Sequence, residues 1–138
     1  LLGQPAIWLL PIAFPLVMAF GGVLGIVGVP IPSVETGIAA SAIILGAMVA
    51  LTVRAPLRIA VALVGGFAIF HGTAHGRELP DGADAVAFAA GFVVATGTLH
   101  LCGIAFGLLA RWPAGRLAVR AAGAAIALTG AAYLVGFV

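Results

Sequence analysis

Histidines are the residues of this chain best suited to chemistry, and two of the three lie four positions apart. His71 and His75 occur in the stretch FAIFHGTAHGRELP, which begins as an apolar run and ends with charged residues. Side chains at positions i and i+4 share one face of a helix. Neutral imidazoles are common ligands of nickel, cobalt, zinc and copper ions. The spacing therefore predicts two nitrogen ligands for a divalent transition metal.

Two carboxylates could complete such a site. Glu78 follows His71 by seven positions and stays on the same helix face if the helix continues, although Pro80 favours termination nearby. Glu35 is expected to begin another helix at the same end of the molecule. Two imidazoles with one or two carboxylates would form a partly filled site of intermediate softness. The alternative interpretation is that these histidines bond only to water, lipid headgroups or a neighbouring carboxylate.

The third histidine, His100, lies inside the apolar run ATGTLHLCGIAFG. Counted from Ala85 at about 1.5 Å per residue, it is more than about 20 Å from that end of its helix, whereas His71 is expected close to the same side of the molecule. We therefore expect an outer capture site and a separate inner site at His100. The alternative is an interhelical hydrogen bond that holds the helices together. Cys102 is interpreted as a small packing residue.

The elements that position these residues are predicted to lie in a membrane. Of the 138 residues, 64% are hydrophobic and 7% are charged, and the mean hydropathy is +1.30. A soluble domain has about 25% charged residues. The chain is therefore an integral membrane protein surrounded by lipid. Its six basic residues are all arginines and its net charge is only +2, which gives no argument for nucleic-acid binding.

Apolar runs, separated by polar, proline-rich and glycine-rich segments, outline the predicted fold. The five runs cover about 6–29, 34–53, 57–76, 85–110 and 117–138. Each is near the ~20 residues that cross a bilayer, and helices satisfy their own backbone hydrogen bonds in lipid. The predicted fold class is all-α, a polytopic transmembrane helix bundle in a single domain, 1–138. Gly21 with Gly25, and Gly103 with Gly107, have the spacing of close helix packing.

Charged residues divide between the two ends of this bundle. One end is expected to carry five arginines, Arg54, Arg58, Arg111, Arg116 and Arg120, and the other carries Glu35, Glu78, Asp81, Asp84 and Arg77. By the positive-inside rule, the arginine-rich loops are cytoplasmic and the acidic loops exterior, or periplasmic in a bacterial inner (cytoplasmic) membrane. The histidine pair is then expected at the exterior end.

Several stretches resemble the HupE/UreJ family of small membrane proteins. They are GVPIPSVETGIAASAIILGAMVAL, FAIFHGTAHGRELP, GFVVATGTLHLCGIAFG and AGAAIALTGAAYLVG. The resemblance runs through nearly the whole chain and implies a six-helix protein that takes up nickel or cobalt for hydrogenase and urease. It also implies metal roles for His71, His75, His100 and Glu35. The family pattern includes an earlier helix with an HPxxGxDH-like motif. This sequence has no such segment, so we expect that an upstream segment was removed or is not represented; the alternative is that the protein lost the motif.

The leading interpretation is a secondary permease for a divalent transition metal, nickel or cobalt. The ion would be captured outside by Glu35, His71, His75 and Glu78 and passed inward through His100. An enzyme is not expected, since no nucleophile set is found, and neither is a permanently bound cofactor. The alternative is a structural or accessory subunit of a larger membrane complex, whose histidines hold helices or bind a pigment or haem. Bis-histidine haem ranks low because His71 and His100 are expected at different depths. Assembly as a homo-oligomer or in a larger complex is left open.

Overall fold

The chain folds into helices throughout the part that its computed structural model describes, which is residues 4–80 and 82–136, with side chains from residue 9 onward. The helices are α1 (Gln4–Ile26), α2 (Val34–Ala50), α3 (Leu57–Arg77), α4 (Ala85–Leu108), the short 3₁₀ helix η1 (Leu109–Arg111) and α5 (Pro113–Leu134). No strand occurs in these described ranges, which confirms the all-α prediction. Asp81 and Val138, the predicted end of the last helix, lie outside the described residues.

Four of the five α-helices are long and apolar enough to cross a membrane: α1, α3, α4 with η1, and α5. The fifth, α2, has 17 residues and lies at the lower limit of the ~17–25 residues that span a bilayer. The protein is therefore a multi-pass membrane protein built as a helical bundle.

Proline and glycine set the helix ends, and they explain where the predicted bounds differ. The last helix begins at Pro113 instead of residue 117, because proline fits the first helical turn, where its missing N–H is not needed. The first helix ends at Ile26 instead of residue 29, since Gly28 adopts a positive φ of 74° and Pro30 follows. The predicted ends of the other helices lie within a few residues of those observed.

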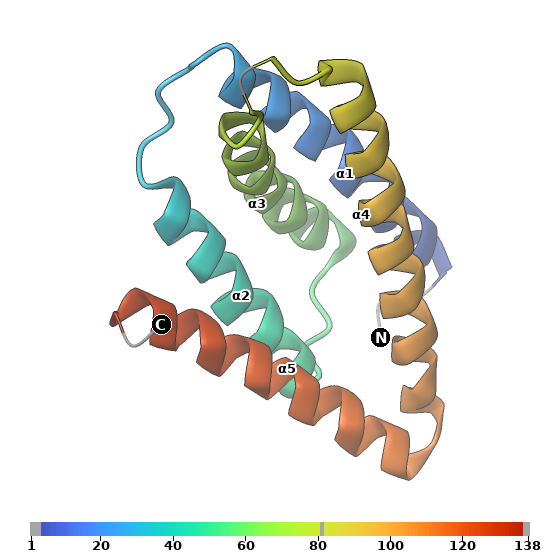
Figure 1. The fold of residues 1–138 in the computed structure, drawn as a ribbon. Helices are drawn as coiled ribbons and strands as arrows, with labels where there is room; N and C mark the ends of the chain where they lie inside the picture. Colours follow the sequence, from blue (N-terminus) through green and yellow to red (C-terminus); the bar gives the residue numbers. More distant parts are fainter. Residues whose placement is uncertain (1–3, 81, 137–138) are drawn as a thin grey trace.

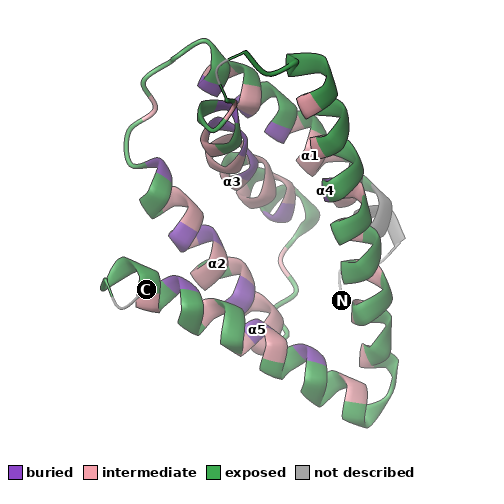
Figure 2. Ribbon diagram, viewed as in Figure 1, coloured by how far each residue is buried: buried purple, intermediate pink, exposed green. Residues whose placement is uncertain are grey.

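The bundle is organised as two tightly packed helix pairs (Figure 1). One pair joins α1 to α3, the other joins α2 to α5, and α2 and α3 connect the pairs. The fourth helix lies beside α1 with much less contact, and Thr96 is its only buried residue among those described. Figure 2 shows α4 exposed along almost its whole length. Lipid can therefore reach most of its apolar surface.

Glycines allow α1 and α3 to approach closely. A Cβ atom added at Gly25 would lie 2.9 Å from the Cα of Gly76, and one added at Gly21 would lie 2.6 Å from the carbonyl oxygen of Ile69. The close contact also lets the buried hydroxyl of Thr73 donate a hydrogen bond of 3.3 Å to the carbonyl of Gly21. The prediction for Gly21 and Gly25 is thus confirmed.

The second predicted glycine pair behaves differently. Gly103 and Gly107 lie on α4, where a Cβ atom would meet nothing within 4 Å. This pair therefore takes no part in helix packing within the described residues, and its prediction as a packing pair is wrong for contacts inside this chain.

Replacing Gly72 by alanine is expected to destabilise the α1–α3 pair. The added methyl would overlap the carbonyl of Met18, which is rigid backbone. Overpacking of this kind costs about 1–3 kcal/mol. The matched control is Gly66→Ala in the same helix, where a Cβ meets nothing within 4 Å. Thermal unfolding in detergent should show a lower midpoint for Gly72→Ala only, and equal midpoints for both variants would contradict the packing description.

Candidate metal site

The histidines gather around one side of α1, on its two neighbours α3 and α4. His71 and His75 occupy the last two turns of α3, and His100 lies in the second half of α4. The phenyl ring of Phe14, on α1, contacts the imidazoles of His71 and His100, with centroids at 6.1 Å and 5.2 Å respectively. The separation in depth expected from the sequence is therefore too large. That estimate assumed parallel helices, whereas Figure 1 shows α4 at an angle to α3.

Ser41, on α2, fixes the orientation of the His71 ring. The Ser41 hydroxyl donates a hydrogen bond of 2.6 Å to the carbonyl of Ile38, and its oxygen lies 3.2 Å from Nε2 of His71. Since the hydroxyl has only one proton and gives it to Ile38, Nε2 of His71 must be the donor in the second bond. The neutral ring then has its lone pair on Nδ1, which is free to bind a metal ion.

Glu78 fixes the orientation of the His75 ring. Nδ1 of His75 lies 3.2 Å from Oε2 of Glu78, and both side chains are largely exposed. A carboxylate only accepts hydrogen bonds, so Nδ1 carries the proton and Nε2 keeps the lone pair. Histidines that bind metals commonly donate their other ring N–H to a carboxylate. The structure thus pairs Glu78 with His75, in the geometry of a residue that orients a metal ligand.

A backbone carbonyl orients His100. Its Nδ1 lies 2.8 Å from the carbonyl oxygen of Thr96, one turn earlier in α4. Because a carbonyl oxygen can only accept, Nδ1 is protonated and Nε2 carries the lone pair. Within the described part of the chain this bond stays inside α4, so the alternative of an interhelical hydrogen bond at His100 is not what the structure has. All three imidazoles therefore share one arrangement: one nitrogen has a hydrogen-bond partner, and the other has none among the described residues.

Glu35 lies apart from the histidines. Its carboxylate accepts a hydrogen bond of 3.0 Å from the hydroxyl of Tyr133, which joins the start of α2 to the end of α5. No three histidine, cysteine or acidic side chains are close enough to hold one ion in the ranges that the structure describes. The candidate ligands are thus distributed along the bundle, and the metal role of Glu35 remains a prediction.

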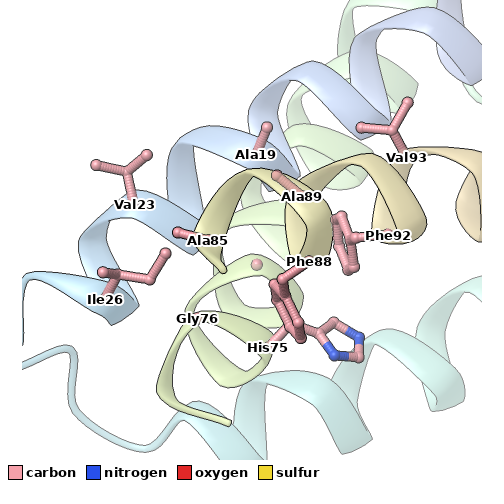
Figure 3. A pocket seen from close by; sticks show the side chains of 12 residues that line it. Ala19, Val23, Ile26, His75, Gly76, Ala85, Phe88, Ala89, Phe92 and Val93 are labelled. Carbon is pink, nitrogen blue, oxygen red and sulfur yellow. The ribbon is translucent and has the colours of Figure 1, made fainter. Parts of the chain in front are cut away.

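An apolar pocket of about 160 Å³ opens beside His75, between α1, α3 and α4. Figure 3 shows Ala19, Val23 and Ile26 on one wall, and His75 with Phe88 and Phe92 at the opposite edge. The rings of His75 and Phe92 meet edge to face at 4.9 Å. On its other side His75 lines a wide, open hollow together with Glu78 and Pro80. His75 therefore borders both hollows, and Glu78 is the charged residue that lines the wider one.

Several residues that shape this site were not found from the sequence. Phe14, Ser41 and Tyr133 contact the candidate ligands from other helices. The only sequence signal for Ser41 and Tyr133 was that each is an isolated polar residue in an apolar run. Cys102 is exposed on α4, so its interpretation as a packing residue is wrong within this chain.

Removing the carboxylate of Glu78 is expected to weaken metal binding without removing a ligand. Loss of a residue that orients a metal-binding histidine costs about 10–100-fold in affinity. Glu78→Ala should show this loss, and Glu78→Gln a smaller one, because its amide oxygen can still accept the proton of His75 Nδ1. Isothermal titration of the purified protein with nickel measures both. Unchanged affinity in Glu78→Ala would contradict the orienting role.

Comparison with known proteins gives one consistent match. The model of the family described as HupE / UreJ protein matches residues 1–133, a range that includes all five candidate residues. The chain is similar to Protein HupE of Rhizobium leguminosarum bv. viciae, with 49% identity over 135 residues, which cover 98% of this chain and 71% of that protein. No solved structure shows a significant match.

Proposed function

The chain belongs to the HupE/UreJ family, and from this premise we propose that it is a secondary permease for nickel or cobalt. The observation that carries the proposal is the common state of the three imidazoles. Each has one nitrogen hydrogen-bonded, to Ser41, Glu78 or the carbonyl of Thr96, and a second nitrogen with no partner in the part of the chain that the structure describes. Imidazole nitrogens suit nickel and cobalt, and a fixed tautomer is what a metal-binding histidine requires.

The proposed route begins at His75, which is the most exposed of the three histidines and borders the hollow that contains Glu78. It continues to His71, one turn deeper on the same face of α3, and then to His100 on α4. Glu35 adds negative charge at the same end of the bundle and attracts cations to it. The family's link to nickel and cobalt, which the sequence resemblance implies, favours these two ions.

The proposed orientation places the histidine pair outside a bacterial inner membrane. The loops at the other end of the bundle, together with the first turns of α3 and α5 that follow them, carry five of the six arginines, and loops and helix ends of this kind are retained in the cytoplasm. An ion gradient or the metal's own gradient would then drive uptake, and the chain transports the ion without a chemical reaction. A haem held between His71 and His100 is disfavoured because the Phe14 ring contacts both imidazoles.

Metal binding is expected to weaken as the solution is made acidic. Protonation places a hydrogen on the free ring nitrogen and removes the lone pair that binds the ion. Nickel affinity should therefore fall as the pH is lowered from neutral to acidic values. Nickel titrations of the purified protein across this range measure the effect. An affinity independent of pH would show that carboxylates, not imidazoles, bind the ion.

The test of the proposed function is metal accumulation in cells without a nickel uptake system of their own. Cells that express the full-length protein should accumulate nickel or cobalt above cells with an empty vector, measured by elemental analysis of washed cells. Manganese and magnesium, which prefer oxygen ligands, should not accumulate. Equal nickel and cobalt contents in both strains would overturn the proposal.

A further inference from the structure

The ring of Phe14 occupies the space where the outer and inner parts of the proposed route meet. Its plane is inclined by 67° to that of His71 and by 47° to that of His100, and the three rings belong to three different helices. The ring is half-buried. Beyond the region of His75 and Phe92, α3 and α4 make little direct contact and are linked through α1. The phenyl ring therefore contacts both imidazoles and links them.

The ring lies against both histidines of the proposed route. A metal–imidazole bond is about 2.0–2.1 Å long, so two nitrogens on one ion lie within about 4 Å of each other. The Phe14 ring contacts both imidazoles, with centroids 6.1 Å from His71 and 5.2 Å from His100, and it offers no lone pair to an ion. An unligated cation in apolar surroundings is very costly. Passage from His71 to His100 is therefore expected to depend on where the Phe14 ring lies.

The backbone around Phe14 is built to bend. Pro11 and Pro15 both lie inside α1, and Phe14 immediately precedes the second of them. Proline has no N–H, so Pro15 cannot bond to the carbonyl of Pro11, and its ring crowds that carbonyl. Sharp bends in helices occur mainly at prolines. The segment that carries the phenyl ring is thus the part of α1 with the weakest backbone ladder.

From these observations we propose that Phe14 is a gate between His71 and His100, closed in this structure, which opens when its side chain and the Pro11–Pro15 segment of α1 move. The gate presupposes the proposed transport function. It makes Phe14 a positioning residue for transport, because it controls when the inner imidazole can receive the ion and binds no ion itself.

The gate predicts how the nickel uptake rate depends on side-chain size at position 14. In proteoliposomes that contain the full-length protein and a nickel-sensitive dye, the rate should increase as the side chain becomes smaller, in the order Trp, Phe, Leu, Ala. Phe14→Ala should be about tenfold faster than wild type, which corresponds to about 1.4 kcal/mol of barrier. A role in packing alone predicts the reverse order, since activity then falls with the volume removed. The matched control is Phe20→Ala, a phenylalanine of the same helix that is 59% exposed.

A second measurement does not depend on transport. Diethyl pyrocarbonate modifies free imidazole nitrogens, and mass spectrometry quantifies the label on each histidine. Phe14→Ala should raise the labelling of His100 several-fold, and Phe20→Ala should leave it unchanged. Thermal unfolding confirms that the variants are folded, and Phe14→Leu replaces Phe14→Ala if the alanine variant is not.

The outcomes separate the gate from the transport function. If the wild type takes up nickel but the rates of the variants follow the reverse size order, or are all equal, the gate is overturned and the permease proposal stands. Unchanged labelling of His100 in folded Phe14→Ala also overturns the gate. No nickel uptake by the wild type overturns the permease and the gate together.

Discussion

Replacing His100 by alanine is expected to stop nickel uptake while the protein still binds nickel at its exterior end. His100 is the last imidazole of the proposed route, and its Nε2 carries the lone pair because Nδ1 donates to the carbonyl of Thr96. The exterior ligands on α3 do not depend on this side chain. Without it, an ion that passes Phe14 meets no nitrogen, and the cost of an unligated cation in apolar surroundings blocks the route. Uptake should fall at least about 100-fold, which is about 2.7 kcal/mol of barrier.

Two measurements on the same variant test this expectation. Nickel uptake into cells gives the rate, and equilibrium dialysis of the purified protein gives the bound nickel. The matched control is Thr98→Ala, since Thr98 lies two positions from His100 and its hydroxyl donates to the carbonyl of Val94 in its own helix. Uptake by His100→Ala at the rate of Thr98→Ala would remove His100 from the route.

Replacing His71 and His75 together by alanine is expected to remove nickel capture itself. The loss should exceed about 100-fold in affinity, because even the loss of an orienting partner costs about 10–100-fold. Uptake at low nickel concentration should fall in proportion. Isothermal titration and uptake assays measure the two effects.

The single variants distinguish the two histidines. His75→Ala should weaken binding more than His71→Ala, since His75 is the more exposed and borders the hollow with Glu78. Cys102→Ala is the control, because it removes an exposed soft ligand that has no role in the account. Full nickel affinity in the double variant would contradict capture by this pair.

The helices could be predicted from the sequence because hydropathy alone determines where a chain can cross a bilayer. The predicted starts at residues 34, 57 and 85 are those observed. The start of the last helix was placed too late, at residue 117, whereas the helix begins at Pro113 because proline favours the first helical turn. Contacts between helices could not be predicted, because runs that are apolar on all sides do not indicate which face meets which neighbour.

Prediction of the candidate site from the sequence was limited in the same way. The spacing of His71 and His75 and their position at a helix end followed from the helical repeat. The hydrogen-bond partners of the candidate residues could not be predicted, because Ser41 is 30 positions from His71 and Tyr133 is 98 positions from Glu35. The expected depth of His100 was too great relative to His71, since residue counting ignores the angle between helices. Phe14 carried no signal of its own, because a phenylalanine in an apolar helix is ordinary.

Metal flux through the purified full-length protein tests the central claim most directly. The protein would be reconstituted in liposomes that contain a dye quenched by nickel and cobalt, and the ion would be added outside at neutral pH. The account predicts that the dye is quenched faster than in protein-free liposomes, and that His100→Ala returns the rate to that of protein-free liposomes. Quenching by the wild-type protein at the protein-free rate, for both nickel and cobalt, would contradict the claim that this chain is a metal permease.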